Sequence, residues 1–270
     1  MPTIDLGAIG AVLSPADEDF VDTAVELERL GFSTIWLTGG PMADLTQIAE
    51  VVRATRSARI ASAIISVDRF GAKDVAALYT ELEHEQPGRF VVGLGGAHGA
   101  DPMGTLNAYL DQLDAVPPTA RVMAALGPRM LRLARDRAAG AFPVLITPEY
   151  TARARETLGR DTTLAVEQLV VLETDPDRAR AIGHGPLDFL GRVPAYQASF
   201  RRMGFTDDDI VPPGDALLDA LVVWGDTATI AERVSQHQRA GADHVAVSLV
   251  AAASGPTLVQ WRQLAEALIR

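Results

Sequence analysis

Residues 118–147 read PTARVMAALGPRMLRLARDRAAGAFPVLIT, and their pattern is the most informative in the chain about its architecture. A short apolar run, Val122 to Leu126, ends at a Gly-Pro pair, which is typical of a strand followed by a tight turn. Apolar residues then recur at helical spacing from Met130 to Ala138, with arginines on the other face. We expect Gly140 to end this helix and Pro143 to Ile146 to begin the next buried strand. The stretch therefore predicts strand, turn, helix, strand.

The turn inside this stretch, Gly127-Pro128-Arg129, stands between the predicted strand and the predicted helix. A glycine there leaves the backbone N–H groups of the helix start open to a bound molecule, and this geometry suits a phosphate. A plain connection between strand and helix is the simpler explanation of a lone glycine turn. Whether the turn binds a ligand therefore depends on the rest of the chain.

The same alternation of apolar runs and helical segments recurs along the chain. The runs expected to be strands are Ile4–Val12, Ser33–Leu37, Arg59–Val67, Arg89–Leu94, Val122–Leu126, Pro143–Ile146, Thr163–Leu172 and Asp243–Val250. They are almost entirely apolar, as expected of parallel strands covered on both faces. Eight such strands over 270 residues favour an α/β fold, a (β/α)8 TIM barrel. A doubly wound sheet also fits the local pattern.

The expected organisation is a single barrel domain over residues 1–270, with a less regular insertion at about 186–218. One helix is expected to begin at Ser14 to Asp17, where a serine that can act as N-cap precedes acidic residues. Another helix is expected to start after Thr174 and to end near Gly183.

Composition limits the possible functions. The formal net charge of −11 argues against a nucleic-acid surface, although arginines and backbone amides can still bind a small anion. The chain has no cysteine, and no pair of histidines has metal-ligand spacing, so no metal is expected. Neither a signal-peptide pattern nor an apolar run of membrane-spanning length is present. We therefore expect a cytoplasmic protein with no membrane or nucleic-acid partner.

Three segments resemble a known family. They are GRFVVGLGGAHG (88–99), AALGPRMLRLARDRAAGAFPVLITPEYTARARETLG (124–159) and WGDTATIAERVSQHQRAGADHVAVSL (224–249). They are similar to bacterial luciferase-like oxidoreductases, most of all to the actinobacterial branch expected to use the deazaflavin coenzyme F420. The resemblance implies a luciferase-like TIM barrel, a cofactor at the C-terminal ends of the strands, hydride transfer at the deazaflavin ring, and a homodimer.

The resemblance also implies a cofactor site made of three parts. In the third strand, SAIIS lies where the family has a β-bulge with a cis peptide bond behind the ring, which here is Ala63–Ile64; an ordinary strand is the alternative. After the fourth strand, Gly95, Gly96, Ala97 and His98 match the loop that lies along the cofactor. Gly127, Pro128 and Arg129 match the phosphate-holding turn, with Thr147 on the neighbouring strand end.

His98 is the side chain that we expect to transfer a proton. An imidazole titrates near neutral pH and can both donate and accept a proton. The position of His98 between glycines, on a loop that follows a strand, favours exposure to a cleft. The alternative is a plain surface histidine.

Two departures from the family keep other functions open. Thr38-Gly39-Gly40-Pro41 stands where many relatives carry an acid or a histidine near the cofactor, and the loops after the second, third and fourth strands are short. The preferred function is an F420-dependent oxidoreductase that acts on a small organic substrate. The alternatives are an FMN-dependent luciferase-like monooxygenase, and a non-catalytic barrel that acts as a partner subunit. The sequence of these loops does not choose between F420 and FMN.

Overall fold

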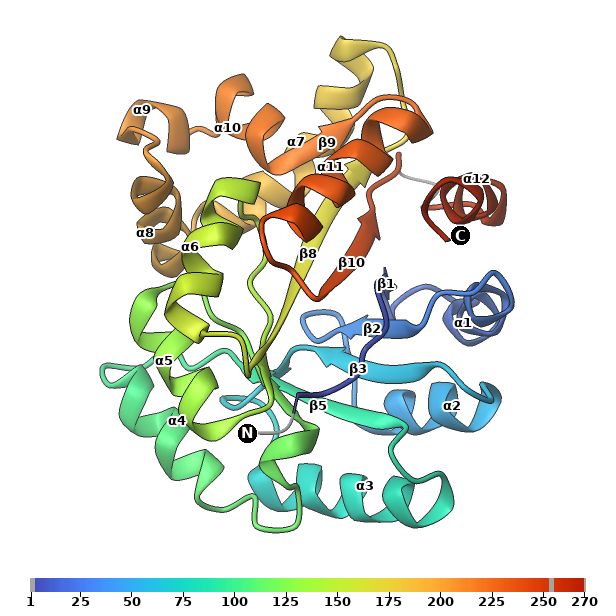
Figure 1. Cartoon of the computed structure of the whole chain (residues 1–270), viewed down its shortest axis with the longest axis vertical. Helices are drawn as coiled ribbons and strands as arrows, with labels where there is room; N and C mark the ends of the chain where they lie inside the picture. The colour runs from blue at the N-terminus through green and yellow to red at the C-terminus, as the bar shows by residue number, and fades with distance from the viewer. Residues whose placement is uncertain (1–2, 253–254, 270) are drawn as a thin grey trace.

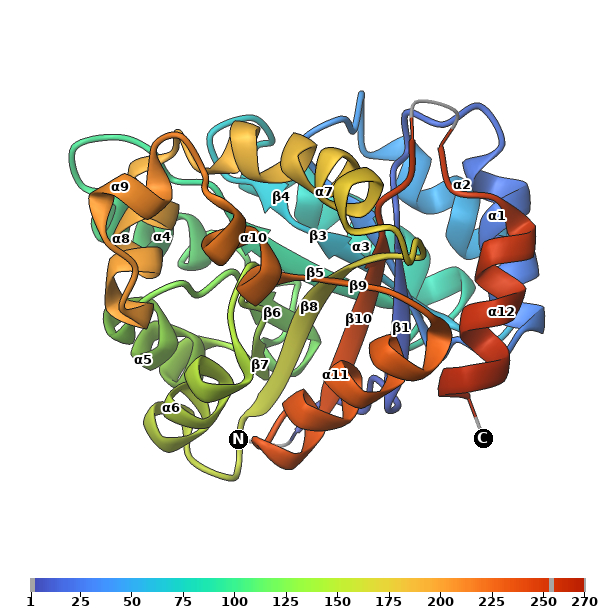
Figure 2. The same ribbon diagram turned by 90° about the horizontal axis from the view of Figure 1, so that it is seen from above.

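A computed structural model describes residues 3–252 and 255–269 of the chain. Parallel strands form its centre, and helices surround them (Figures 1 and 2). The barrel strands are β1 (Ile9–Leu13), β2 (Thr34–Thr38), β3 (Arg59–Ala63), β5 (Phe90–Gly95), β6 (Arg121–Met123), β7 (Gly140–Ala141), β8 (Thr163–Val171) and β10 (His244–Leu249). Two short strands, β4 (Ile65–Ser66) and β9 (Val222–Trp224), pair with β5 and β8.

The sheet closes into a ring because β10 pairs with both β1 and β8. Around the ring the order is β10-β1-β2-β3-β5-β6-β7-β8, and every neighbouring pair is parallel. This confirms the predicted (β/α)8 TIM barrel. Side chains on the inner faces of the strands fill the ring and form one apolar cluster: Leu6, Val12, Trp36, Ala61, Val91, Val122, Phe142, Ala165 and Ala246. Along each strand they alternate with side chains that pack against the helices.

Most helices follow the barrel strands in turn. They are α1 (Phe20–Arg29), α2 (Thr46–Ala54), α3 (Ala72–Glu85), α4 (Pro102–Leu110), α5 (Pro128–Arg137), α6 (Pro148–Leu158), α11 (Thr227–Arg239) and α12 (Leu258–Leu268). Between β8 and β9 lie α7 (Pro176–Leu190), α8 (Pro194–Met203), α9 (Asp207–Ile210) and α10 (Asp215–Leu221). Among the helices of residues 3–252 and 255–269, we find none with the length and hydropathy needed to span a membrane.

Two predictions about the helices are wrong. The first helix begins at Phe20, because residues 14–17 form a turn in which Asp17 N–H donates to the Ser14 carbonyl (3.3 Å). The helix after β8 does not end near Gly183 but continues to Leu190. Gly183 is buried in that helix, and a Cβ added there would lie 3.4 Å from Leu218 on α10. This glycine therefore allows close helix packing and does not end the helix.

The chain before β1 lies against the base of the barrel, the end at which the strands begin. The Thr34 hydroxyl donates to the Leu6 carbonyl (2.6 Å), and the N–H of Ile4 donates to the Thr163 hydroxyl (3.1 Å). Gly7 has φ +68°, a left-handed conformation that interrupts an extended chain. The predicted first strand, Ile4–Val12, therefore begins only at Ile9.

Residues 118–147 contain the predicted strand, helix and strand, but the second strand lies earlier in the chain than predicted. The helix ends at Arg137, and Gly140–Ala141 forms β7 where Pro143–Ile146 was expected. A Cβ at Gly140 would lie 2.8 Å from the Thr163 carbonyl oxygen, so glycine permits the close pairing with β8. Past β7, Val144 makes one isolated bridge to β8, and Leu145 has φ 53°, which ends the extended conformation.

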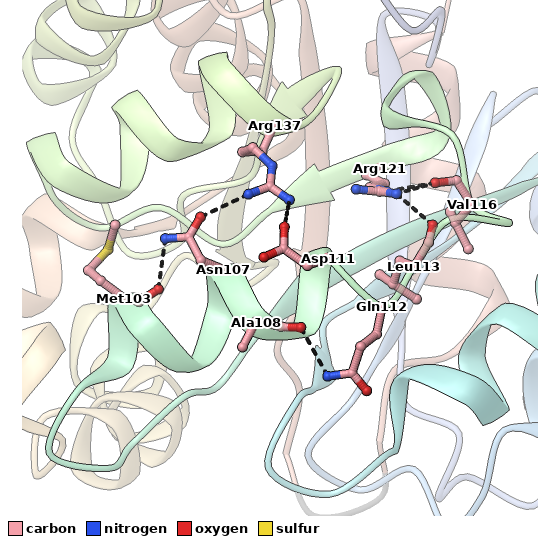
Figure 3. A network of polar contacts seen from close by, with 9 residues as sticks. All are labelled: Met103, Asn107, Ala108, Asp111, Gln112, Leu113, Val116, Arg121 and Arg137. Atoms are coloured by element: carbon pink, nitrogen blue, oxygen red, sulfur yellow. Dashed lines mark hydrogen bonds and ion pairs between the residues drawn. The ribbon is translucent and has the colours of Figure 1, made fainter.

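Hydrogen bonds and an ion pair link β6 and α5 to α4 and to the loop after it (Figure 3). Arg137 of α5 donates to Asn107 Oδ1 on α4 (3.1 Å) and pairs with Asp111, the residue that caps the C-terminus of α4 (2.6 Å). The buried guanidinium of Arg121, the first residue of β6, donates to the Leu113 carbonyl (2.6 Å) in the loop after α4. The network therefore holds α4, β6 and α5 together below the Gly127 turn.

Candidate functional site at the barrel mouth

The third barrel strand carries a one-residue bulge near its C-terminal end. Ala61 pairs with Val91 of β5, whereas Ile65 pairs with Leu94, so β3–β4 uses four steps where β5 uses three. The peptide bond between Ala63 and Ile64, within the bulge, is cis. The structure thus has the bulge and the cis bond where the resemblance predicts them.

Glycines on both sides allow the neighbouring strands to approach this bulge. A Cβ at Gly39, just after β2, would lie 1.7 Å from the Ile64 carbonyl oxygen. A Cβ at Gly93 on β5 would lie 1.9 Å from the Ser62 carbonyl oxygen. No side chain fits at either position. The missing acid after the second strand, which we noted as a departure from the family, coincides with a backbone position that only glycine fits.

The loop after β5 lies beside the bulge. A Cβ added to Gly95 would lie 2.8 Å from Ala124 Cβ and 3.2 Å from Ile64 Cδ1. Gly96 has φ +75° and lies against Ser66, and the partly buried Ala97 packs on the core. The structure therefore brings the predicted residues of the bulge and of this loop together at the mouth of the barrel, the end where the strands finish.

His98 lies further out on the rim and is paired with an acid. Its Nδ1 lies 3.0 Å from Asp68 Oδ2, and its backbone N–H donates to the same oxygen (2.9 Å). The His98 side chain is 66% exposed. The carboxylate holds the imidazole with Nδ1 inward, which leaves Nε2 for contact with another group. Asp68 follows the bulged strand, and the structure places its carboxylate against His98.

The predicted phosphate turn forms the start of α5. Gly127 is the N-cap and Pro128 the first helical residue, so the first N–H groups of α5 have no helical partner. Arg129 is exposed on the first turn. The sequence analysis missed Arg202 of α8, whose guanidinium donates to the Leu126 carbonyl (2.8 Å) and lies 3.3 Å from the Cβ position of Gly127. The turn therefore combines a helix N-terminus with a nearby positive charge.

Thr147 is the N-cap of α6 and lies next to this turn. Its hydroxyl accepts from Tyr150 N–H (3.3 Å), and the Tyr150 hydroxyl donates to the Leu126 carbonyl (2.7 Å). Tyr150 thus joins the start of α6 to the residue before Gly127. Thr147 and the Gly127 turn are brought together, as the resemblance predicts, and the hydroxyl of Thr147 has a structural role in capping.

The sequence analysis also missed Glu167, a carboxyl inside the barrel. It follows Ala165 by two residues on β8, so its side chain points to the same inner face as that member of the interior cluster. Burial raises the pKa of Glu167 to about 7, and a hydrogen bond from Ser248 of β10 opposes this rise. Burial, and then the charge of Glu167, raise the pKa of Tyr196 on α8. The signal in the sequence is a single acid in the run TLAVEQLVV (163–171).

Thr38, the last residue of β2, adds a second polar atom at the mouth. It lies two residues beyond Trp36 and so points to the same inner face of the barrel. Its Oγ1 is buried and, within the described residues, makes no hydrogen bond. Buried polar atoms without a partner are rare in folded proteins, so this hydroxyl is available to a bound molecule.

Two surface cavities lie away from the mouth. One, of about 420 Å³, lies between β9 and α11 and is lined in part by Thr229 and Arg233. The other, of about 680 Å³, lies between α3 and the segment after α4 and is lined in part by Lys73 and Gln112. Neither contains a predicted site residue. The part of the chain that the structure describes holds no group of three His, Asp or Glu side chains placed to bind a metal ion.

No protein-family model matches this sequence, and no curated protein matches it at a significant level. Solved structures match its fold. An F420-dependent secondary alcohol dehydrogenase in complex with an F420–acetone adduct has a TM-score of 0.74 at 13% identity, over 99% of this chain and 98% of that one. The F420-dependent tetrahydromethanopterin reductase of Methanopyrus kandleri has a TM-score of 0.70 at 15% identity, over 97% and 98%.

An FMN-bound enzyme is similar as well. The oxygenating constituent of 3,6-diketocamphane monooxygenase from Pseudomonas putida, in complex with FMN, has a TM-score of 0.69 at 12% identity, over 96% of both chains. At these identities the likeness establishes the fold. The fold is therefore the luciferase-like TIM barrel that the sequence resemblance predicts, a fold shared by F420-dependent and FMN-dependent enzymes.

Proposed function

We propose that this protein is an F420-dependent oxidoreductase, of the actinobacterial luciferase-like branch, that transfers a hydride between the deazaflavin and a small organic substrate. The observation that carries this proposal is the one-residue bulge at Ala63–Ile64, packed against Gly39 and Gly95 at the barrel mouth. Sites of TIM-barrel enzymes lie at this end of the barrel. Two of the structures with the same fold belong to F420-dependent enzymes.

The residues at the mouth fit such a cofactor. In this proposal the ring would lie against the bulge and beside Gly95, Gly96 and Ala97, which carry no side chain larger than a methyl group. The hydroxyl of Thr38 supplies a hydrogen-bonding group that has no partner within the described residues. The Gly127 turn, with Pro128, Arg129, Arg202 and Thr147 around it, holds the phosphate through N–H groups and positive charge. The bound cofactor supplies the hydride chemistry, and the protein orients it.

His98 transfers a proton at the rim in this proposal, and Asp68 is a positioning residue for it. The Nδ1–Asp68 contact orients the imidazole. We expect His98→Ala to lower the turnover of the F420-loaded protein at least 10-fold while leaving F420 affinity within 3-fold, within the usual range for general acid–base catalysis. His184→Ala, on α7, is the matched control. Unchanged turnover in His98→Ala with the cofactor bound would rule out the proton role.

An FMN-dependent monooxygenase is the second candidate, because an FMN-bound monooxygenase shares the fold. The test is a parallel titration of the purified protein with F420 and with FMN, followed by tryptophan fluorescence. Saturable binding of F420 alone in the micromolar range supports the proposal, and preference for FMN supports the second candidate. Binding of neither cofactor would favour a non-catalytic barrel that acts as a partner subunit. Sedimentation of the same samples would test the homodimer that we propose from the resemblance.

A further inference from the structure

The mouth of the barrel contains a carboxyl for which the proposed function has no role. β3–β4 is the third strand around the barrel and β8 the seventh, so the bulge and Glu167 lie on opposite sides of an eight-stranded ring. The bulge and the Glu167 side chain both face the interior of the barrel, at the end where the strands finish. A flat ring against the bulge would therefore have its free face toward Glu167.

The surroundings of Glu167 keep its carboxyl away from other charges. In the segment past β7 its neighbour is Val144, on β10 the nearby residue is Ser248, and α8 contributes Tyr196. Tyr196 is the titratable group that these elements present; the ordinary pKa of tyrosine, about 10, already leaves it neutral near pH 7, and burial raises that pKa further. Burial without a basic partner raises the pKa of Glu167 to about 7, so near neutral pH both its protonated and its ionised forms are populated.

Gln168, the residue after Glu167 on β8, lies in a different environment. Gln168 points outward and is buried, its Oε1 accepts a hydrogen bond from His237 Nε2–H (2.9 Å), and its Nε2 donates to the Leu221 carbonyl (3.0 Å). Gln168 is thus tied into the packing between β8, α10 and α11. Within the described residues the Glu167 carboxyl has the hydrogen bond from Ser248 but none to a surrounding helix, so packing between strand and helices explains Gln168 but not Glu167.

We propose that Glu167 is a catalytic residue that exchanges a proton with the substrate between the cofactor ring and β8. This inference rests on the proposed function. With a carbonyl substrate, a bound reduced deazaflavin would supply the hydride, and with it two electrons, to the carbonyl carbon. The carbonyl oxygen takes the proton of Glu167, so the C=O double bond becomes a C–O single bond. The products are an alcohol, oxidised cofactor and the Glu167 carboxylate, which regains a proton from water. In the opposite direction the carboxylate accepts the hydroxyl proton as the hydride leaves.

The first test does not depend on turnover or on knowing the substrate. Infrared difference spectra between pH 5 and pH 9 follow the protonated-carboxyl band of Glu167 in the wild type, in Glu167→Gln and in Glu156→Gln. The last variant changes an exposed glutamate on α6 and is the matched control. We expect a band with a midpoint near pH 7 in the wild type and the control, and none in Glu167→Gln. F420, or FMN if only FMN binds, should move this midpoint upward, because a ring over the mouth excludes water.

A midpoint that the bound cofactor leaves unchanged would overturn the role of Glu167 while the proposed function stands. A wild-type protein that binds neither cofactor would overturn both, and the titration of the free protein identifies this case. If Glu167→Gln does not fold, Ser248→Ala replaces it. Loss of the serine hydrogen bond should raise the midpoint of the same band, and an unchanged band would show that it does not come from Glu167.

The second test is kinetic and uses the F420-loaded protein with a panel of small secondary alcohols, 2-propanol first. We expect Glu167→Gln to lower kcat at least about 100-fold, with KM within a few-fold and with loss of the pH dependence that has its midpoint near 7. Glu156→Gln should behave as the wild type. A Glu167→Gln variant that keeps wild-type kcat and pH profile would overturn the proposal.

Discussion

Buried polar atoms at the two ends of the barrel interior differ in their hydrogen bonding. At the base, His244 is fully buried, its Nδ1–H donates to the Gly7 carbonyl (2.8 Å), and its Nε2 accepts from Trp36 Nε1–H (3.0 Å). At the mouth, the described residues give the Thr38 hydroxyl no partner, and they give the Glu167 carboxyl no basic one. In the described residues the base of the barrel thus has hydrogen-bonded polar atoms, and the mouth has a hydroxyl without a partner and a carboxyl without a basic one.

The difference indicates that polar groups at the base stabilise the fold and that polar groups at the mouth serve ligand binding. Satisfied buried groups add to the stability of the fold, whereas unsatisfied ones cost stability unless a ligand completes them. The base should therefore tolerate few changes, and changes at the mouth should affect ligand binding more than folding. The following predictions test that contrast.

The largest effect is expected at the base, for Trp36→Ala. Trp36 is fully buried and stacks on Phe142, with 4.0 Å between the ring centroids. Its removal leaves a cavity and deprives His244 of a donor, so we expect a loss of about 3–5 kcal/mol in the free energy of unfolding. Urea denaturation measures it. The control is Val259→Ala on α12. The side chain of Val259 is 61% exposed, so its truncation should change the free energy of unfolding by no more than about 0.5 kcal/mol. Equal losses in the two variants would contradict the prediction.

The next effect is expected at the bulge, from two adjacent glycines. Gly39→Ala would place a Cβ 1.7 Å from the Ile64 carbonyl oxygen, so the backbone must move, at a cost of about 3 kcal/mol. Gly40→Ala meets no atom within 4 Å and should change stability by no more than about 0.5 kcal/mol. Both are measured by urea denaturation. A similar midpoint for the two variants would show that the mouth adapts more easily than the geometry indicates.

The sequence predicted the architecture well because the parallel strands are apolar runs bounded by turn residues. It misplaced β7, because the pairing there depends on Gly140 approaching Thr163, a contact between residues far apart in the sequence. The bulge followed from a resemblance, since no local pattern in SAIIS indicates it. Glu167 was missed because its direction follows from the register of β8, and Arg202 because α8 meets the Gly127 turn only in three dimensions.

We also expect pH to change the contributions of the two ends to the free energy of unfolding in opposite directions. The pKa of His244 is lowered to about 4, mainly by burial, so between pH 4 and 6.5 the unfolded chain binds more protons at this residue and stability falls as pH falls. The pKa of Glu167 is raised to about 7, so between pH 4.5 and 7 the folded chain binds more protons there and stability falls as pH rises.

Glu167→Gln isolates the contribution of the mouth. Relative to the wild type, the variant should gain stability as pH rises from 4.5 to 7, by at most about 3 kcal/mol at about 1.4 kcal/mol per pH unit. Urea midpoints at pH 5, 6, 7 and 8 measure this difference, with Glu156→Gln as the control that should follow the wild type. A difference that stays constant over this range would mean that Glu167 is ionised in the folded protein, as an ordinary surface carboxyl is.

The smallest effect compares two threonines on the same strand. Thr34→Val at the base removes a hydroxyl that donates to the Leu6 carbonyl (2.6 Å), and we expect a loss of about 1 kcal/mol. Thr38→Val at the mouth removes a buried hydroxyl for which the described part of the chain provides no partner, so stability should stay the same or rise slightly. F420 affinity should show the reverse order, with Thr38→Val weakened several-fold and Thr34→Val unchanged. If Thr38→Val loses as much stability as Thr34→Val, then its hydroxyl is satisfied without a ligand, and the contrast between the two ends is wrong at this position.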